Sequence, residues 1–184
     1  MRSALNTHRT PNYFELLGLK PQFLLDEQDL QARWKERAAQ VHPDRFASGT
    51  AAEKRIAMQW SAELNEAYRV LRDPVARAKY LIEINGYPVE EKPGQQLDLE
   101  FLEQQMSWRE TLEALRDNQD TGGNSMQQLQ ALAAEVQQAQ QQCVSKLAQL
   151  IEAQCWPQAA KALQQWMFIE KFNQEVLRAT ATVA

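Results

Sequence analysis

The chain has 184 residues, of which 44% are hydrophobic and 24% are charged. This composition is typical of a globular protein with a buried core and excludes a disordered tail, and the length excludes a large multidomain enzyme. Residues 1–85 carry 13 basic and 11 acidic side chains, a net charge of +2, and residues 86–184 carry 7 and 13, a net charge of −6. Neither balance suits a nucleic-acid-binding surface, which needs many Lys and Arg side chains.

The sequence contains no signal for export or for membrane insertion. Its longest apolar runs have four residues, whereas a membrane-spanning helix needs about 20. The first ten residues lack the apolar stretch of a secretory signal. The two cysteines, Cys143 and Cys155, form no CxxC pair, so neither a disulfide framework nor a four-ligand zinc site is expected. We therefore expect a cytoplasmic protein with no membrane contact, no metal and no cofactor.

Glycine and proline residues lie where helices should begin or end, which predicts an all-α fold. The pair Thr10-Pro11 predicts the cap and first residue of a short helix that ends at Gly18. A second helix is expected from Asp26 to about His42. Its buried side is expected to consist of Leu30, Trp34, Ala38 and Val41, which recur at helical spacing.

Two further helices are expected in the first half of the chain. Thr50 and Glu53 form a capping-box signature that predicts the start of the third helix. This helix continues through an apolar stripe of Trp60, Leu64, Ala67 and Leu71. Asp73-Pro74 starts the fourth helix, which ends near Asn85-Gly86. Residues 86–97 then indicate a linker between two domains, because they contain two prolines and two glycines.

The second half predicts a three-helix bundle over residues 98–180, with helices at about 98–116, 125–153 and 157–180. The middle helix has a nearly coiled-coil spacing of apolar residues, namely Leu129, Leu132, Val136, Ala139, Cys143, Leu147 and Leu150. The last helix has a core stripe of Ala159, Leu163, Trp166, Ile169 and Val176. A Gln-rich amphipathic helix could pair between chains, but a monomer is the simplest expectation.

The first helix of this bundle carries two apolar stripes. At about 100° per residue, the stripe expected in the core consists of Phe101, Trp108, Leu112 and Leu115. Leu99, Leu102 and Met106 fall on another side, among Glu103, Glu110 and Glu113. On the last helix Phe168 falls outside the core stripe and is expected to be exposed. Apolar residues on an acidic, exposed surface predict a binding site. Alternatively, the linker or the N-terminal domain folds over these residues and buries them.

The tripeptide His42-Pro43-Asp44 lies between two predicted amphipathic helices. Pro43 cannot continue the hydrogen bonds of the second helix, so the tripeptide ends that helix. Taken alone, it is explained as a simple helix end and turn. A proline-fixed turn could also present a histidine and a carboxylate to a partner in a defined geometry. Catalysis by the chain itself is not expected, because the only candidate pair, Cys143 and His42, falls in different domains.

The order of the four helices, the tripeptide and the string LNEAYRVLRDPVARAKY (64–80) together resemble the J-domain family of co-chaperones. The resemblance implies a J-domain over residues 10–85. It also implies that His42, Pro43 and Asp44 bind a DnaK-type chaperone and trigger its ATP hydrolysis. Arg33, Lys35 and Arg37 would form the basic face that assists this binding, although Glu36 interrupts them. Alternatively, the three lie on an ordinary solvated helix face.

The second half has neither a Gly/Phe-rich linker nor Cys-rich repeats. With the strings HPDRFASG and FLEQQMSWRETLE, the chain is similar to the bacterial, HscB-type co-chaperones of iron–sulfur cluster assembly. That family implies an L-shaped molecule whose partners are an HscA-like ATPase chaperone and an IscU-type scaffold. The scaffold-binding candidates implied by position are Leu102, Glu103, Met106, Ser107, Glu110 and Phe168. Two alternatives stay open: a J-protein for another client, and a helical adaptor that stimulates no ATPase.

Overall fold

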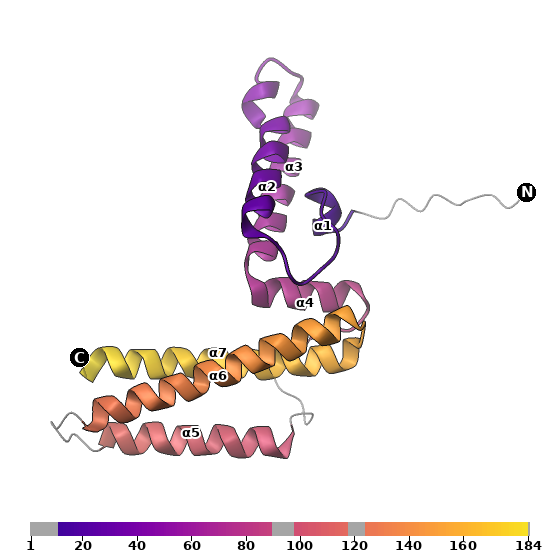
Figure 1. The fold of residues 1–184 in the computed structure, drawn as a ribbon. Helices are drawn as coiled ribbons and strands as arrows, with labels where there is room; N and C mark the ends of the chain where they lie inside the picture. Colours follow the sequence, from indigo (N-terminus) through magenta and orange to yellow (C-terminus); the bar gives the residue numbers. More distant parts are fainter. Residues whose placement is uncertain (1–10, 90–97, 118–123, 184) are drawn as a thin grey trace, which may run out of the picture. The chain divides into compact units, whose positions relative to one another are not determined.

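The computed structural model describes residues 11–89, 98–117 and 124–183 of the chain. The chain divides into two compact units, one up to Ile84 and the other from Asn85 onward. Within the described ranges every regular element is helical, so the all-α expectation is confirmed (Figure 1). None of the helices described is both long and apolar enough to cross a membrane. The predicted 86–97 linker falls mostly on residues 90–97, which lie outside the described ranges.

The short helix α1 spans Tyr13–Leu16 and begins two positions later than expected. The Asn12 side chain accepts a hydrogen bond from the Glu15 backbone N–H, and the Glu15 carboxylate accepts one from the Asn12 N–H. Asn12 is therefore the cap, and the prediction of Pro11 as the first helical residue was wrong; Thr10 lies outside the described residues. Gly18 follows the helix with φ +67°, a conformation that favours glycine.

Helices α2 (Glu27–Gln40) and α3 (Ala51–Arg72) lie side by side and form a hairpin (Figure 1). The Asp26 side chain caps α2 as expected. The expected buried side of α2 was only partly correct, since Leu30 is buried but Trp34, Ala38 and Val41 are half-buried. Trp34 lies at the hairpin's edge, where its ring stacks on Tyr68.

The apolar stripe predicted for α3 is buried at three of its four positions. Leu64, Ala67 and Leu71 are buried, whereas Trp60 is 40% exposed. Trp60 lies two turns from the beginning of α3, where the described residues leave it uncovered. The hairpin is therefore well packed towards α4 and open near the end that carries the tripeptide.

Helix α4 (Pro74–Ile84) joins α1 and α3 into one unit. The Tyr80 hydroxyl accepts a hydrogen bond from the Tyr13 N–H, and the two tyrosine rings stack. Arg77 is buried, donates a hydrogen bond to the Leu71 carbonyl and lies over a phenylalanine ring. These contacts fix the turn between α3 and α4, where Asp73 caps the fourth helix as expected.

The second unit contains α5 (Leu99–Asp117), α6 (Asn124–Glu152) and α7 (Trp156–Val183). Helices α6 and α7 pack along each other, and α5 lies beside them (Figure 1). All five expected core residues of α7 are buried. On α6, Ala139 and Leu150 are only half-buried, and Ile151 is buried where the expected stripe had Leu150. On α5, Leu115 is half-buried, while Phe101, Trp108 and Leu112 are buried.

The capping box at the start of α3 yields a prediction for acid stability. Hydrogen bonds from the Thr50 backbone and hydroxyl lower the pKa of Glu53. Because the native pKa is lowered, Glu53 contributes stability above its unfolded-state pKa and loses it as the pH falls through the native value. We expect Glu53→Gln to lower the free energy of unfolding at neutral pH and to remove part of its decline in acid. Urea unfolding across this pH range measures both effects.

The exposed Glu83 on α4 provides the matched control for this prediction. Glu83→Gln should leave the pH dependence of the free energy of unfolding as it is in the unmodified chain. If Glu53→Gln and Glu83→Gln gave the same acid profile, the capping box would not contribute to stability.

Candidate interaction surfaces

The tripeptide forms a short, well-defined turn at the tip of the α2–α3 hairpin. Helix α2 ends at Gln40, and residues Pro43–Phe46 form one turn of 3₁₀ helix, η1, where the sequence indicated a helix end and turn. The backbone N–H of Asp44 donates to His42 Nδ1 at 3.3 Å, and the Arg45 N–H donates to the His42 carbonyl at 3.0 Å. Proline at the start of η1 fixes the backbone between these bonds. These bonds and the proline restrict the backbone conformations that are open to the tripeptide.

Both polar side chains of the tripeptide are available to a partner. The side chains of His42 and Asp44 are 57% and 91% exposed, with His42 Nδ1 3.5 Å from an Asp44 carboxylate oxygen. Because Nδ1 accepts the backbone hydrogen bond, the proton of a neutral imidazole lies on Nε2. The turn thus offers one N–H donor and one carboxylate acceptor close together.

Arg45 is a further residue of this turn that the sequence analysis did not single out. Its Nη1 donates to the Ala39 carbonyl at 3.3 Å, in the last turn of α2. A cation at a helix C-terminus satisfies an unpaired carbonyl and interacts favourably with the helix dipole. The sequence held this signal, since an arginine directly after a helix end often takes such a position. Arg45 connects η1 to the end of α2.

The three basic residues expected on one face of α2 do not lie together. Arg33 pairs with Asp29 at 2.8 Å and donates to the Gly18 carbonyl. Arg37 lies on the same side, with its guanidinium beside Gly18. Lys35 follows Arg33 by two positions, about 200° around the helix, and is exposed. The arginines thus face the α1 side of the hairpin, and Lys35 faces away from it.

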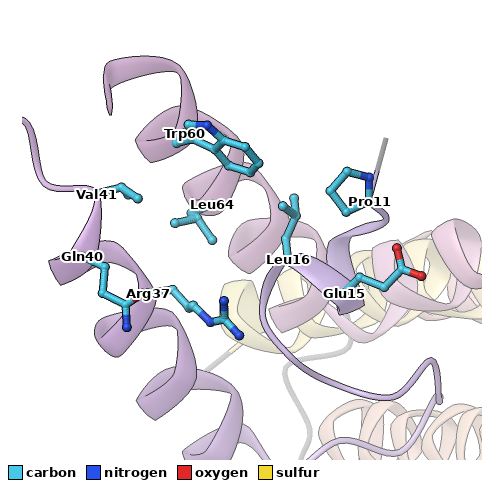
Figure 2. A pocket seen from close by; sticks show the side chains of 8 residues that line it. All are labelled: Pro11, Glu15, Leu16, Arg37, Gln40, Val41, Trp60 and Leu64. Atoms are coloured by element: carbon cyan, nitrogen blue, oxygen red, sulfur yellow. The ribbon is translucent and has the colours of Figure 1, made fainter. Parts of the chain in front are cut away.

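A pocket of about 230 Å³ lies between α1, α2 and α3 (Figure 2). Arg37 extends from α2 towards α1 at its margin, and Trp60 from α3 covers another side. The remaining lining residues are Pro11, Glu15, Leu16, Gln40, Val41 and Leu64. Arg37 therefore borders an apolar hollow, and it does not extend a continuous basic face with Lys35.

The second apolar stripe of α5 is exposed as expected. Leu99, Leu102 and Met106 are 71%, 42% and 61% exposed. Glu103 and Glu110 are exposed beside them. Ser107 is also exposed, but it follows Met106 directly and so lies about 100° further around the helix. We call the surface formed by Leu99, Leu102 and Met106 the α5 strip.

Phe168 differs from its expected exposure. It is half-buried, and its ring meets Phe101 edge-on with the centroids 6.4 Å apart. The expectation failed because α5 packs against this part of α7, a contact that helical periodicity within α7 cannot show. Phe168 lies at the α5–α7 contact, next to the beginning of the α5 strip.

The α5 strip is held in place by the opposite side of its own helix. Trp108 is 2% exposed, stacks on Phe172 and donates from its indole nitrogen to Glu135 at 2.7 Å. Neither Phe172 nor Glu135 was singled out in the sequence. Since these contacts come from α6 and α7, they fix the rotation of α5 and so determine which side of the helix faces solvent.

The described residues contain no group of three or more His, Cys, Asp or Glu side chains able to hold a metal ion. Cys143 is buried between α6 and α7 and donates to the Ala162 carbonyl. Burial raises the pKa of this thiol to about 11, so it stays protonated at neutral pH.

Two family models match the sequence, each within one unit. Residues 12–80 match a model described as the DnaJ domain, and residues 97–177 match one described as the HSCB C-terminal oligomerisation domain. A co-chaperone protein HscB homolog from Bordetella avium is 43% identical, covering 90% of this chain and 95% of the relative. One from Burkholderia mallei is 39% identical, covering 90% and 91%. These comparisons do not test the oligomeric state of this chain, so the monomer expected from the sequence stays a prediction.

Two solved structures share this all-helical fold. Chaperone HscB from Vibrio cholerae matches with a TM-score of 0.76 at 32% identity, covering 95% of this chain and 100% of the other. The crystal structure of human co-chaperone protein HscB matches with a TM-score of 0.79 at 22% identity, covering 94% and 84%. At the lower identity the likeness concerns the fold alone.

The Trp108 anchor yields a prediction for the stability of the second unit. We expect Glu135→Leu to cost about 1–3 kcal/mol, because it leaves the buried indole N–H without an acceptor. Glu135→Gln keeps an acceptor oxygen at the same place and should cost clearly less. Urea unfolding of the two variants measures the difference. Equal losses for leucine and glutamine would show that the hydrogen bond does not hold α5.

Proposed function

The chain belongs to the HscB family of J-domain co-chaperones, and we propose that it stimulates the ATPase of an HscA-like, DnaK-type chaperone and delivers an IscU-type iron–sulfur scaffold to it. One observation carries this proposal. Two exposed surfaces of different chemistry lie on different compact units, the tripeptide turn on one and the α5 strip on the other. Such a division suits a protein that joins two partners.

The tripeptide is the proposed contact with the ATP-bound chaperone. His42 supplies a hydrogen-bond donor and Asp44 a carboxylate, and η1 holds both before binding occurs. Little conformational entropy is then lost on docking, so more of the contact energy is available to favour one conformation of the chaperone. We propose that this conformation is the one that hydrolyses ATP.

The α5 strip is the proposed contact with the scaffold. Its three apolar side chains would lose water on binding, and the acidic residues around them would set orientation and partner choice. The scaffold-binding set is proposed as Leu102, Glu103, Met106, Ser107, Glu110 and Phe168. Within it Phe168 would contribute from the α5–α7 contact and Ser107 from the edge of the surface.

In the proposed mechanism, the chain brings the two partners together because it carries both contacts. A scaffold held on α5 stays near any chaperone held on the tripeptide, so its effective concentration there is raised without a new contact. Hydrolysis then traps the scaffold on the chaperone. The chain contributes binding and positioning, and the chaperone carries out the hydrolysis.

His42→Gln should abolish stimulation of the chaperone's ATPase and leave scaffold affinity unchanged, because glutamine cannot reproduce the imidazole geometry and the turn belongs to the other unit. Single-turnover ATP hydrolysis and isothermal titration with the scaffold measure the two activities separately. A parallel loss of scaffold binding would refute this division of labour.

Replacing Leu102, Met106 and Phe168 together by alanine should do the reverse. We expect scaffold affinity to fall roughly 100-fold, because central apolar residues carry most of the energy of an interface. Scaffold-independent ATPase stimulation should stay at its original level. Leu177→Ala is the matched control, since Leu177 is an exposed leucine of α7. Unchanged scaffold affinity in the triple variant would show that the surface is elsewhere.

Lys35 should matter more for chaperone binding than Arg33. The charge of Arg33 is already paired with Asp29, whereas the exposed Lys35 faces away from α1. We expect Lys35→Ala to raise the co-chaperone concentration for half-maximal stimulation about 3- to 10-fold at low salt, and Arg33→Ala to raise it less. The difference should shrink as salt screens the charge. A larger effect of Arg33→Ala would contradict this assignment.

A further inference from the structure

The first turn of α5 carries the most exposed residue of the α5 strip. Leu99 opens the helix and is 71% exposed, and Asp98 precedes it. The Leu102 N–H donates to the Asp98 carbonyl at 3.1 Å, the first hydrogen bond of the helix. The N–H groups of a first turn have no partners within their helix, so this turn frays unless other contacts hold it.

Asp98 is held by two side chains from α7. Lys161 Nζ lies 2.5 Å from one carboxylate oxygen, and the Gln165 amide donates to the other at 3.4 Å. Lys161 and Gln165 are one helical turn apart and therefore lie on one side of α7. Hydrogen bonding to Lys161 also lowers the pKa of Asp98, which keeps the carboxylate charged.

The described residues make few other contacts with this end of α5. One turn further on, Phe101 meets Phe168 of α7 edge-on. The next residue on the inner side is Gln105, which is 7% exposed, and its Nε2 has no hydrogen-bond partner among the described residues. The deeply buried anchor, Trp108, comes only after that. The polar contact at Asp98 therefore lies at the end of α5 that its core holds least.

We propose that Lys161 is a positioning residue for scaffold binding: through Asp98 it fixes the first turn of α5, and so holds Leu99 and Leu102 in a continuous strip with Met106. Leu99 thereby joins the contact surface. This inference rests on the proposed function, because it assumes that the α5 strip binds the scaffold. Lys161 acts through Asp98 and needs no contact with the partner.

Lys161→Met tests this role, because methionine keeps most of the side-chain length and removes the charge. We expect scaffold affinity to fall about five-fold, the upper range for a partly exposed ion pair. Lys171→Met, at an exposed lysine of the same helix, should have no effect. The 184-residue chain is titrated with the scaffold by calorimetry, well below its melting temperature.

Charge reversal separates positioning from a general loss of stability. Lys161→Asp places two carboxylates together and should weaken binding more than Lys161→Met. Adding Asp98→Lys recreates the pair with opposite polarity and should restore part of the lost affinity. The restoration is incomplete because a lysine at the start of a helix opposes the helix dipole. No restoration at all would overturn the inference.

A double-mutant cycle with Leu99→Ala tests the connection to the strip. If Lys161 acts by placing Leu99, then Leu99→Ala should cost less affinity in the Lys161→Met background than in the unmodified chain. Strictly additive effects would overturn the positioning role.

The triple alanine variant distinguishes failure of this inference from failure of the proposed function. Loss of binding in that variant together with normal affinity for Lys161→Met would overturn the role of Lys161 and leave the scaffold surface standing. Normal affinity in the triple variant would overturn both.

Discussion

A helix at the edge of a three-helix bundle can bury only one side, and this constraint creates the exposed surface of α5. Helices α6 and α7 pack along each other with α5 beside them (Figure 1). The buried apolar residues of α5 are Phe101, Trp108 and Leu112. Its other apolar side must then face solvent, which is unfavourable unless a partner covers it. The neighbouring glutamates keep this surface hydrated when no partner is bound. The core of the bundle thus determines which apolar side of α5 is exposed.

The same reasoning applies to the tripeptide turn. The α2–α3 hairpin is packed through Leu30, Leu64 and Leu71, and its tip extends beyond this core. Hydrogen bonds within the turn, and the bond from Arg45 to the end of α2, replace the packing that is missing there. The two exposed surfaces therefore differ in chemistry. The turn is polar and preformed, which suits a hydrophilic contact, and the α5 strip suits an apolar one.

Much of the fold could be predicted from the sequence because its signals are local. Asp26, the Thr50–Glu53 box and Asp73 each cap the helix that they were expected to cap. The errors in the predicted buried residues have tertiary causes. Trp34 and Trp60 were expected in the core by periodicity, but periodicity gives only the direction of a side chain and not whether a neighbouring element covers it. Phe168 shows the converse, because α5 covers a position that appeared outside the stripe of α7.

The candidate sites also combine features that local geometry predicts with features that depend on tertiary contacts. The exposure of Leu102 and Met106 follows from helical geometry within one element, so the sequence could predict it. The separation of Lys35 from Arg33 and Arg37 is also local geometry, but the charges alone suggested a single face. The contacts of Asp98 with Lys161 and Gln165 join residues more than 60 positions apart, and nothing in one sequence connects them.

The measurement that tests the central claim most directly is single-turnover ATP hydrolysis by the DnaK-type chaperone of the same cell, with and without this protein and an IscU-type scaffold. If the protein binds both partners at once, it should stimulate hydrolysis, and the scaffold should increase the stimulation further. Stimulation indifferent to the scaffold, or no stimulation at all, would contradict it.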